Sequence, residues 1–154
     1  MYAAEAASID GLGRRWRRLA DVQAHVDRLI ESDWFLERWP DLVRCVVERR
    51  GRGSTWSAGC QLGPAGPGRG ATEGVILLAD DGLRQPVVLH ELAHLVVPEE
   101  VGHQPPFAEA LLTLVRHDMG FFAWAECWHA LRRSPLFALV RPEVGPALER
   151  SLVT

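Results

Sequence analysis

The chain has 154 residues, of which 47% are hydrophobic and 24% charged, and its formal net charge is −3. These values are typical of one globular domain with its own hydrophobic core, and they exclude an intrinsically disordered chain. The slightly negative charge argues against electrostatic capture of nucleic acid, and no apolar run approaches the roughly 20 residues of a membrane helix. We therefore expect a cytoplasmic protein with one domain over residues 1–154, of which residues 1–13 form a loose N-terminus.

The N-terminal part of the chain predicts two helices. Apolar residues recur at helical spacing over residues 14–30, which indicates an amphipathic helix with one buried face. A shorter helix is expected around Trp34 and Phe35, because Pro40 would end it soon afterwards.

Three short segments then predict a small sheet. The β-branched run 42–47 and the segment 55–62 flank a turn rich in arginine and glycine, so we expect them to pair as a hairpin. Residues 63–70 are rich in glycine and proline and read as a loop. The apolar run 74–79 predicts the third strand of the sheet.

The rest of the chain is predicted to be helical. A helix of about three turns is expected between Pro86 and Pro98, because proline suits the first turn of a helix and cannot continue one. A second helix would run from Pro105 to Gly120, and a third would cover residues 121–133. The order of one helix, a small three-stranded sheet and further helices places the chain in the α+β class.

The helix after Pro86 carries an HExxH motif, His90-Glu91-Leu92-Ala93-His94. Two histidines four residues apart lie about 40° apart around a helix axis, so both imidazoles can reach one cation. Zn²⁺ is the usual occupant of such a site, and Glu91 can take a proton from a zinc-activated water without binding the metal itself. The alternative is a pair of hydrogen-bonded core histidines. The surrounding residues are apolar, and burial of these three polar groups would be costly unless a metal satisfied them.

A catalytic zinc site needs a third protein ligand and one open position. His103 is the first candidate, because the loop after Pro98 can return the chain across the site and the next helix begins directly afterwards. Glu109, on that next helix, is the second candidate. His117 and Asp118 are the third, and they could instead orient an imidazole through a hydrogen bond.

The metal motif, followed by Gly102-His103-Gln104-Pro105-Pro106-Phe107, resembles the HExxH…HGPxF arrangement of SprT-like and related minimal zincins. More closely, residues 18–120 are similar to a family of small actinobacterial HExxH proteins regarded as metallohydrolases. Four further segments that look like this family are 22–28, 38–40, 47–51 and 85–89. This chain carries Gln104 where the pattern usually has glycine.

The resemblance implies a zincin-like core and a Zn²⁺ cofactor, but no particular substrate. It implies that His90, His94 and His103 match the metal ligands and that Glu91 matches the catalytic carboxylate. Zincins keep an edge strand that pairs with an extended substrate, and the run 74–79 is expected to be that strand.

Together these features predict a zinc-dependent hydrolase that acts on a peptide or protein substrate, with Glu91 as general base. Two alternatives stay open. One is hydrolysis of RNA or another phosphodiester, as in the YbeY-type proteins, although the glutamate directly after His90 favours peptidase chemistry. The other is a non-enzymatic domain with a structural or regulatory zinc. Contact with nucleic acid through the arginine-rich segments 14–18 and 49–52 is less favoured, because such segments are more often solvated surface.

Overall fold

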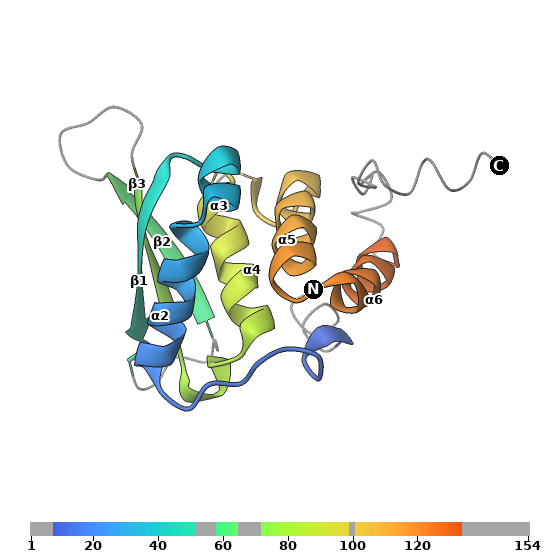
Figure 1. The fold of residues 1–154 in the computed structure, drawn as a ribbon, viewed down its shortest axis with the longest axis horizontal. Helices are drawn as coiled ribbons and strands as arrows, with labels where there is room; N and C mark the ends of the chain where they lie inside the picture. The colour runs from blue at the N-terminus through green and yellow to red at the C-terminus, as the bar shows by residue number, and fades with distance from the viewer. Residues whose placement is uncertain (1–7, 52–57, 65–71, 99–100, 134–154) are drawn as a thin grey trace.

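The computed structural model describes residues 8–51, 58–64, 72–98 and 101–133 of the chain. Figure 1 shows the sheet at one side, helices α2 and α4 against it, and helices α5 and α6 further away. The described elements are α2 (Leu19–Ile30), α3 (Asp33–Arg38), β1 (Leu42–Arg49), β2 (Ala58–Pro64), β3 (Thr72–Leu78), a short 3₁₀ helix (Asp80–Gly82), α4 (Gln85–Val96), α5 (Pro105–Asp118) and α6 (Phe121–Arg132). The predicted mixture of helices with a small sheet is confirmed.

The strand order of the sheet is β1-β3-β2, so the last strand in the sequence lies in the centre. β1 runs parallel to β3, whereas β2 runs antiparallel to it. The predicted hairpin between residues 42–47 and 55–62 is therefore wrong, because β3 separates the two strands; residues 52–57 lie outside the described residues. The prediction that the run 74–79 forms the sheet edge is also wrong. β3 has the most apolar sequence of the three strands, so a central position buries the most apolar surface. β2 is therefore left at the edge of the sheet, antiparallel to β3.

A side chain of α2 occupies the outer edge of β1. Gln23 donates from Nε2 to the carbonyl oxygen of Cys45 at 2.8 Å, and its Oε1 accepts from the amide of Val47 at 2.7 Å. These two hydrogen bonds replace those that another strand would make, which protects the edge from unwanted pairing. They also hold α2 against the sheet.

The segment before α2 is extended, not helical as predicted from residue 14 onward. Trp16 donates its amide to the carbonyl of Leu83 at 2.9 Å, and Gln85 donates its amide to the carbonyl of Arg14 at 2.9 Å. This pairing with the chain just before α4 satisfies backbone groups that a longer helix would have satisfied internally. The start of α4 is therefore tied to the N-terminal segment.

The predicted loose N-terminus is wrong for the part that the structure describes. Ile9 belongs to the hydrophobic core and is only 2% exposed. Asp10 forms an ion pair with Arg84 at 2.7 Å. Burial of an apolar side chain and a tether to the residue before α4 order this segment, while residues 1–7 lie outside the described residues.

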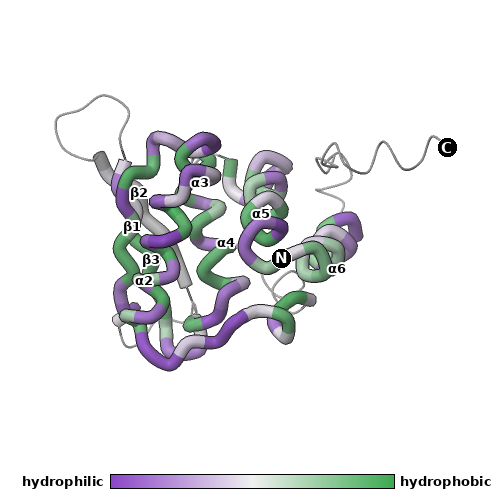
Figure 2. The backbone as a smooth tube through the Cα atoms, in the orientation of Figure 1, coloured by the Kyte–Doolittle hydropathy of each residue, from purple (hydrophilic) through white to green (hydrophobic). Residues whose placement is uncertain are grey.

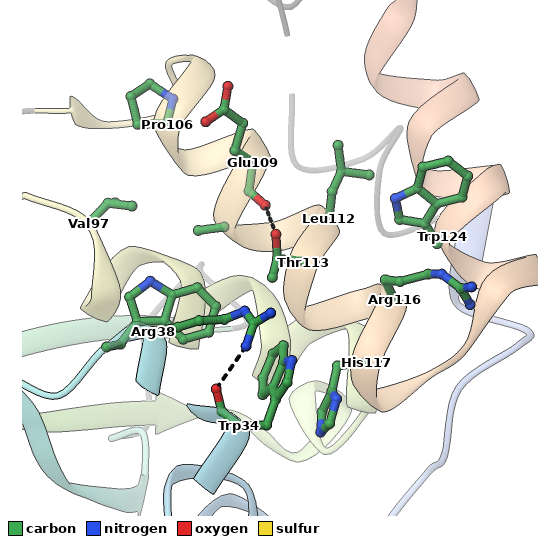
Figure 3. Close-up of a pocket in the computed structure, with 12 residues that line it drawn as sticks. Trp34, Arg38, Val97, Pro106, Glu109, Leu112, Thr113, Arg116, His117 and Trp124 are labelled. Carbon is green, nitrogen blue, oxygen red and sulfur yellow. Dashed lines mark hydrogen bonds between the residues drawn. The ribbon is translucent and has the colours of Figure 1, made fainter. Parts of the chain in front are cut away.

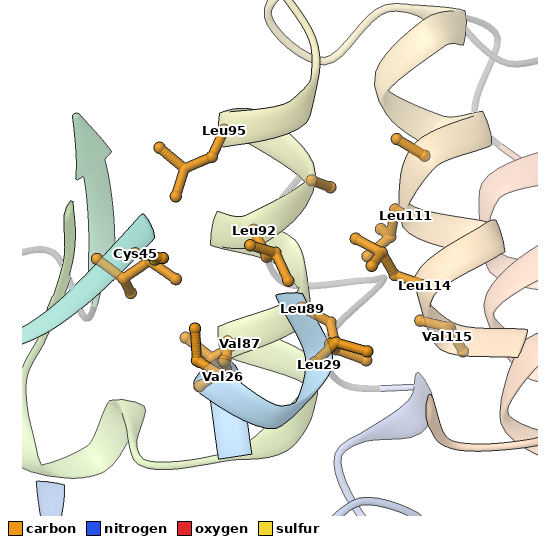
Figure 4. Close-up of a cluster of buried hydrophobic side chains, with 14 of the residues drawn as sticks. Val26, Leu29, Cys45, Val87, Leu89, Leu92, Leu95, Leu111, Leu114 and Val115 are labelled. Atoms are coloured by element: carbon orange, nitrogen blue, oxygen red, sulfur yellow. The ribbon is translucent and has the colours of Figure 1, made fainter. Parts of the chain in front are cut away.

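Helix α4 is the central element of the hydrophobic core. All of its residues are buried except His94 and Val96. Figure 4 shows its leucines between the side chains of β1 and α2 on one side and those of α5 on the other. In contrast, α2 alternates between hydrophobic and hydrophilic residues along its length (Figure 2), as expected for a helix with one solvent-exposed face. Neither α4 nor any other helix of the described residues is long and apolar enough to cross a membrane.

The central strand approaches α4 closely at Gly74. A Cβ atom at this position would lie 2.6 Å from Cδ1 of Leu95 and 3.3 Å from Cδ1 of Leu42. Both leucines are almost fully buried, so neither can move aside without disturbing the core. Gly74 thus sets the distance between the sheet and the helix that carries the metal motif.

Replacement of Gly74 tests this close approach. We expect Gly74→Val to lower the free energy of unfolding by about 1–3 kcal/mol, because the added side chain overpacks the interface between β3 and α4. The measurement is urea-induced unfolding followed by tryptophan fluorescence. Gly63→Val is the control, since a Cβ at Gly63 meets no atom within 4 Å. Equal stability of the two variants would contradict the proposed role of Gly74.

Candidate metal centre

Three histidine side chains converge beside α4. His90 and His94 lie on successive turns of α4, and His103 lies in the loop before α5. Nε2 of His103 is 3.2 Å from Nε2 of His94 and 3.2 Å from Nε2 of His90. Within the described residues, this is the one group of three or more potential metal ligands whose donor atoms all lie within 4.8 Å of one another. The structure therefore brings together the three residues that the sequence singled out as ligands.

The backbone around His103 explains how the loop reaches the site. Gly102 has a φ of +54°, in the left-handed region that glycine adopts most readily. Pro105 then starts α5, since proline is favoured in the first turn of a helix. His103 is thus held between a glycine turn and the start of a rigid helix.

Phe107 forms one wall of the histidine cluster. Its side chain is fully buried, and its ring lies against all three imidazoles. The distance between ring centroids is 4.3 Å to His94, 4.9 Å to His90 and 4.9 Å to His103. Phe107 is not among the site residues expected from the sequence. The signal that could have placed it at the site is its position in the first turn of the helix that directly follows the His103 loop.

The imidazoles of the cluster are neutral at pH 7. Burial lowers the pKa of His90 to about 3, and the neighbouring His94 and His103 contribute further. Burial, followed by repulsion from His103, lowers the pKa of His94 to about 4. The pKa of His103 is also lowered, chiefly by burial. Metal binding requires deprotonated imidazoles, so the cluster is held in the form that a cation needs.

Hydrogen bonds among the three Nε2 atoms cannot satisfy all of them at once. Each neutral imidazole nitrogen has either one hydrogen or one lone pair in the ring plane. Nε2 of His103 lies 3.2 Å from two other Nε2 atoms, and it can share a well-directed hydrogen bond with only one of them. A cation accepts the lone pairs of all three nitrogens at once.

Glu91 lies about 100° around the axis of α4 from His90 and about 60° from His94, so its side chain is offset from the imidazoles but not on the opposite face of the helix. It does not belong to the group of candidate ligands among the described residues. Its side chain is only 1% exposed. Glu91 is thus shielded from bulk water.

The other candidate ligands lie elsewhere. Glu109 and His117 line a separate cavity, where the ring of His117 stacks on Trp34 with centroids 3.6 Å apart. Asp118 pairs with Nε2 of His25 at 2.8 Å and accepts a hydrogen bond from Nε2 of Gln85 at 2.6 Å. Burial alone would raise the pKa of Asp118, but the hydrogen bonds from His25 and Gln85 lower it overall. Asp118 thus joins α5 to α2 and α4, and none of the three residues belongs to the histidine cluster.

Comparison with protein families, with curated proteins and with solved structures finds no match to this chain. The ligand and chemistry of the site must therefore be inferred from its own residues and geometry.

The depressed pKa values predict how stability depends on pH. In the unfolded chain His90 and His94 take up protons near the ordinary pKa of 6.5, whereas in the folded protein they do so only near 3 and 4. The unfolded state thus binds more protons between these values, and the free energy of unfolding of the metal-free protein falls as the pH is lowered from 6.5 towards 4.

Urea unfolding in the presence of a chelator, at a series of pH values, measures this dependence. His94→Gln is expected to show a shallower fall, because one of the buried bases is gone. The exposed His129 provides the control variant, His129→Gln, which should keep the steep fall. Identical pH profiles for wild type and His94→Gln would contradict the pKa values described above.

The glycine turn before His103 can be tested separately. We expect Gly102→Ala to weaken Zn²⁺ binding by about tenfold or more, because the left-handed backbone is strained for alanine and His103 shifts. Competition with a chromophoric chelator measures the affinity. Gly120→Ala is the matched control: Gly120 also has a positive φ, +91°, but it lies between α5 and α6. An equal loss of Zn²⁺ affinity in both variants would show a general loss of stability rather than a specific effect on His103.

Proposed function

We propose that this protein is a cytoplasmic zinc-dependent hydrolase that cleaves peptide bonds. The observation that carries the proposal is the convergence of three neutral imidazole nitrogens beside α4, the helix that also holds Glu91. Two nitrogens bound to one tetrahedral zinc at about 2.05 Å lie about 3.3 Å apart. The separations of 3.2 Å from His103 to His90 and His94 are close to this value. The donor atoms therefore suit Zn²⁺ in type, and two of their three separations match a tetrahedral zinc site.

The number of ligands supports a catalytic site rather than a structural one. Structural zinc sites are closed by four protein ligands, whereas catalytic sites use three and leave one position for water or substrate. The cluster in the described part of the chain has three members, and Glu109 is not one of them. His94 and His103 are half-buried while His90 is buried, so the site is reached from the side of His94 and His103.

The chain's own residues suit a hydrolytic reaction. A bound Zn²⁺ would activate a water molecule and polarise the carbonyl of the scissile bond. Glu91, next to His90 in the chain, would take a proton from the attacking water and pass it to the leaving amine. Because Glu91 is shielded from bulk solvent, that proton would stay within the site during the reaction. Phe107 would hold the three imidazoles in place and exclude water from their buried side.

The sheet offers a place for an extended peptide. β2 is the antiparallel edge strand and contacts α4, so a peptide that pairs with β2 would run past the helix that carries His90 and His94. The opposite edge, β1, is already hydrogen-bonded by Gln23. This combination of an edge strand and a motif helix supports our proposal that the fold is zincin-like and related to the small HExxH metallohydrolases that the chain resembles.

Glu91 distinguishes a catalytic zinc from a structural one. We expect wild-type protein to contain one Zn²⁺ per chain, and Glu91→Gln to keep this metal content and the fold, because the amide has nearly the same shape. Hydrolysis by Glu91→Gln should fall by a factor of about 10²–10⁴, since the amide cannot accept the proton of the water. The measurements are elemental analysis and cleavage of a broad panel of peptides and unfolded proteins.

His94→Ala is the companion variant and is expected to lose both metal and activity. Absence of stoichiometric zinc from the wild type would refute the metal centre itself. Equal cleavage by wild type and Glu91→Gln would refute the role of Glu91 as general base. Full zinc content without cleavage of any peptide, together with cleavage of an RNA panel, would instead support the phosphodiesterase alternative.

A further inference from the structure

A second candidate site lies between α3, α5 and α6 (Figure 3). It is a cavity of about 860 Å³, a volume typical of sites that bind small molecules. The histidines of the metal centre do not line it. Its walls combine tryptophan side chains with two arginines, and the proposed hydrolytic reaction uses none of them.

The aromatic wall of the cavity is ordered by contacts among its own residues. The rings of Trp34 and His117 stack with an interplanar angle of 4°. Trp39 meets Trp34 edge-on, with ring centroids 5.7 Å apart. Trp124 of α6 adds a further indole to the lining (Figure 3). Because His117 and Arg38 cover the faces of Trp34, a flat apolar group would meet the edges of the Trp34 and Trp39 indoles or lie against Trp124.

Two arginines bring positive charge to the same cavity. Arg38 lies over Trp34, with its guanidinium carbon 4.8 Å from the ring centroid, and donates from Nη1 to the carbonyl of Trp34 at 3.2 Å. Arg116 lies over the ring of Phe121 at 5.1 Å. Neither arginine forms an ion pair with a carboxylate of the described residues. Their guanidinium groups are thus positioned by aromatic rings while their charges stay available to an anion.

The one carboxylate of the cavity limits what kind of anion fits. Glu109 lies seven residues before Arg116 on α5, which corresponds to two turns or about 10 Å along the helix. A ligand with one anionic group can place it near the arginines and keep away from Glu109. A polyanion that runs through the cavity would meet the charge of Glu109 and be repelled.

We propose that this cavity binds a small organic carboxylate that carries an aromatic ring. The carboxylate pairs with the guanidinium group of Arg38, which lies over Trp34 of the cavity, since the planar fork of arginine matches two carboxylate oxygens; Arg116 adds positive charge to the lining. The ring lies among Trp34, Trp39 and Trp124. None of the three histidines of the metal centre lines this site, and the proposal does not rest on the hydrolase activity.

The test uses 3-phenylpropionate as the probe and the full chain as the protein, with binding measured by calorimetry. Two related compounds serve as controls: 3-phenylpropionamide keeps the ring without the charge, and propionate keeps the charge without the ring. We expect 3-phenylpropionate to bind with a Kd of about 1 mM or lower, and each control compound to bind at least about tenfold more weakly.

Variants locate the bound probe. Arg38→Gln is expected to weaken binding of 3-phenylpropionate by about tenfold or more, and Arg116→Gln to weaken it less, because it removes only a more distant charge. Both arginines are exposed, so thermal unfolding curves should show that these variants still fold. Arg132→Gln is the matched control, because Arg132 also lies over an indole, that of Trp128 at 5.8 Å, but does not line this cavity. It should bind the probe as the wild type does.

A carboxylate could also bind directly to a metal ion, so the titration is repeated after removal of metal with a chelator. Unchanged binding is expected and supports the cavity. Loss of binding with the metal would place the probe at the histidines and overturn the proposal. Lack of binding by 3-phenylpropionate, equal binding of its amide, or unchanged affinity in Arg38→Gln would also overturn it.

Discussion

The burial of α4 between the sheet and α5 is the packing constraint on which the rest of the structure depends. On the sheet side, Gly74 allows Leu95 to approach the central strand, and on the other side the helix packs against α5. This arrangement places His90 and Glu91 in a nearly solvent-free environment. Such burial is costly for polar groups unless they are satisfied. The same burial lowers the pKa of His90 and His94 and keeps their imidazoles neutral. The packing that costs free energy for these polar groups therefore also keeps them in the form that can bind a cation.

Helix α5 fixes one side of the histidine cluster, because contacts at both ends of the helix hold it in place. Near its N-terminus, Phe107 lies against the three imidazoles. At its C-terminus, Asp118 is hydrogen-bonded to Gln85 of α4 and paired with His25 of α2. The loop that carries His103 is therefore attached to a helix that cannot easily shift or rotate. A metal bound to the folded state alone would add to this stability, because the unfolded chain does not hold the three histidines together.

The same helix separates the two candidate sites. His103, just before α5, and Phe107, in its first turn, lie at the histidine cluster. Glu109 and Arg116, further along the same helix, line the cavity next to α3 and α6 (Figure 3). At the histidine cluster, three neutral imidazoles lie against the apolar ring of Phe107. The cavity, in contrast, is lined by indole rings and guanidinium groups. The ligands that we propose differ accordingly: a divalent cation in the first and an aromatic anion in the second. Because no histidine of the cluster lines the cavity, substitutions can change the residues of one candidate site and leave those of the other in place.

Local signals in the sequence were sufficient to predict the motif helix and its neighbours. Prolines mark the starts of α4 and α5, and the spacing of His90 and His94 places both on one face of a helix, since these features depend on residues a few positions apart. His103 could be chosen because it lies just before a helix start and after a short loop. The sequence also indicated that α4 would be buried, because its residues are apolar on nearly every side.

Only the tertiary structure decided which segments lie beside each other. The pattern of residues 74–79 predicts a strand, but its central place depends on pairing with two strands distant in sequence. Residues 14–18 have helical periodicity, yet their backbone pairs with Leu83 and Gln85 instead. The ring of Phe107 against the histidines, the pairing of Asp118 with His25, and the cavity between α3, α5 and α6 arise in the same way. Each depends on the free energy of contacts between residues far apart in the chain, which no local pattern contains.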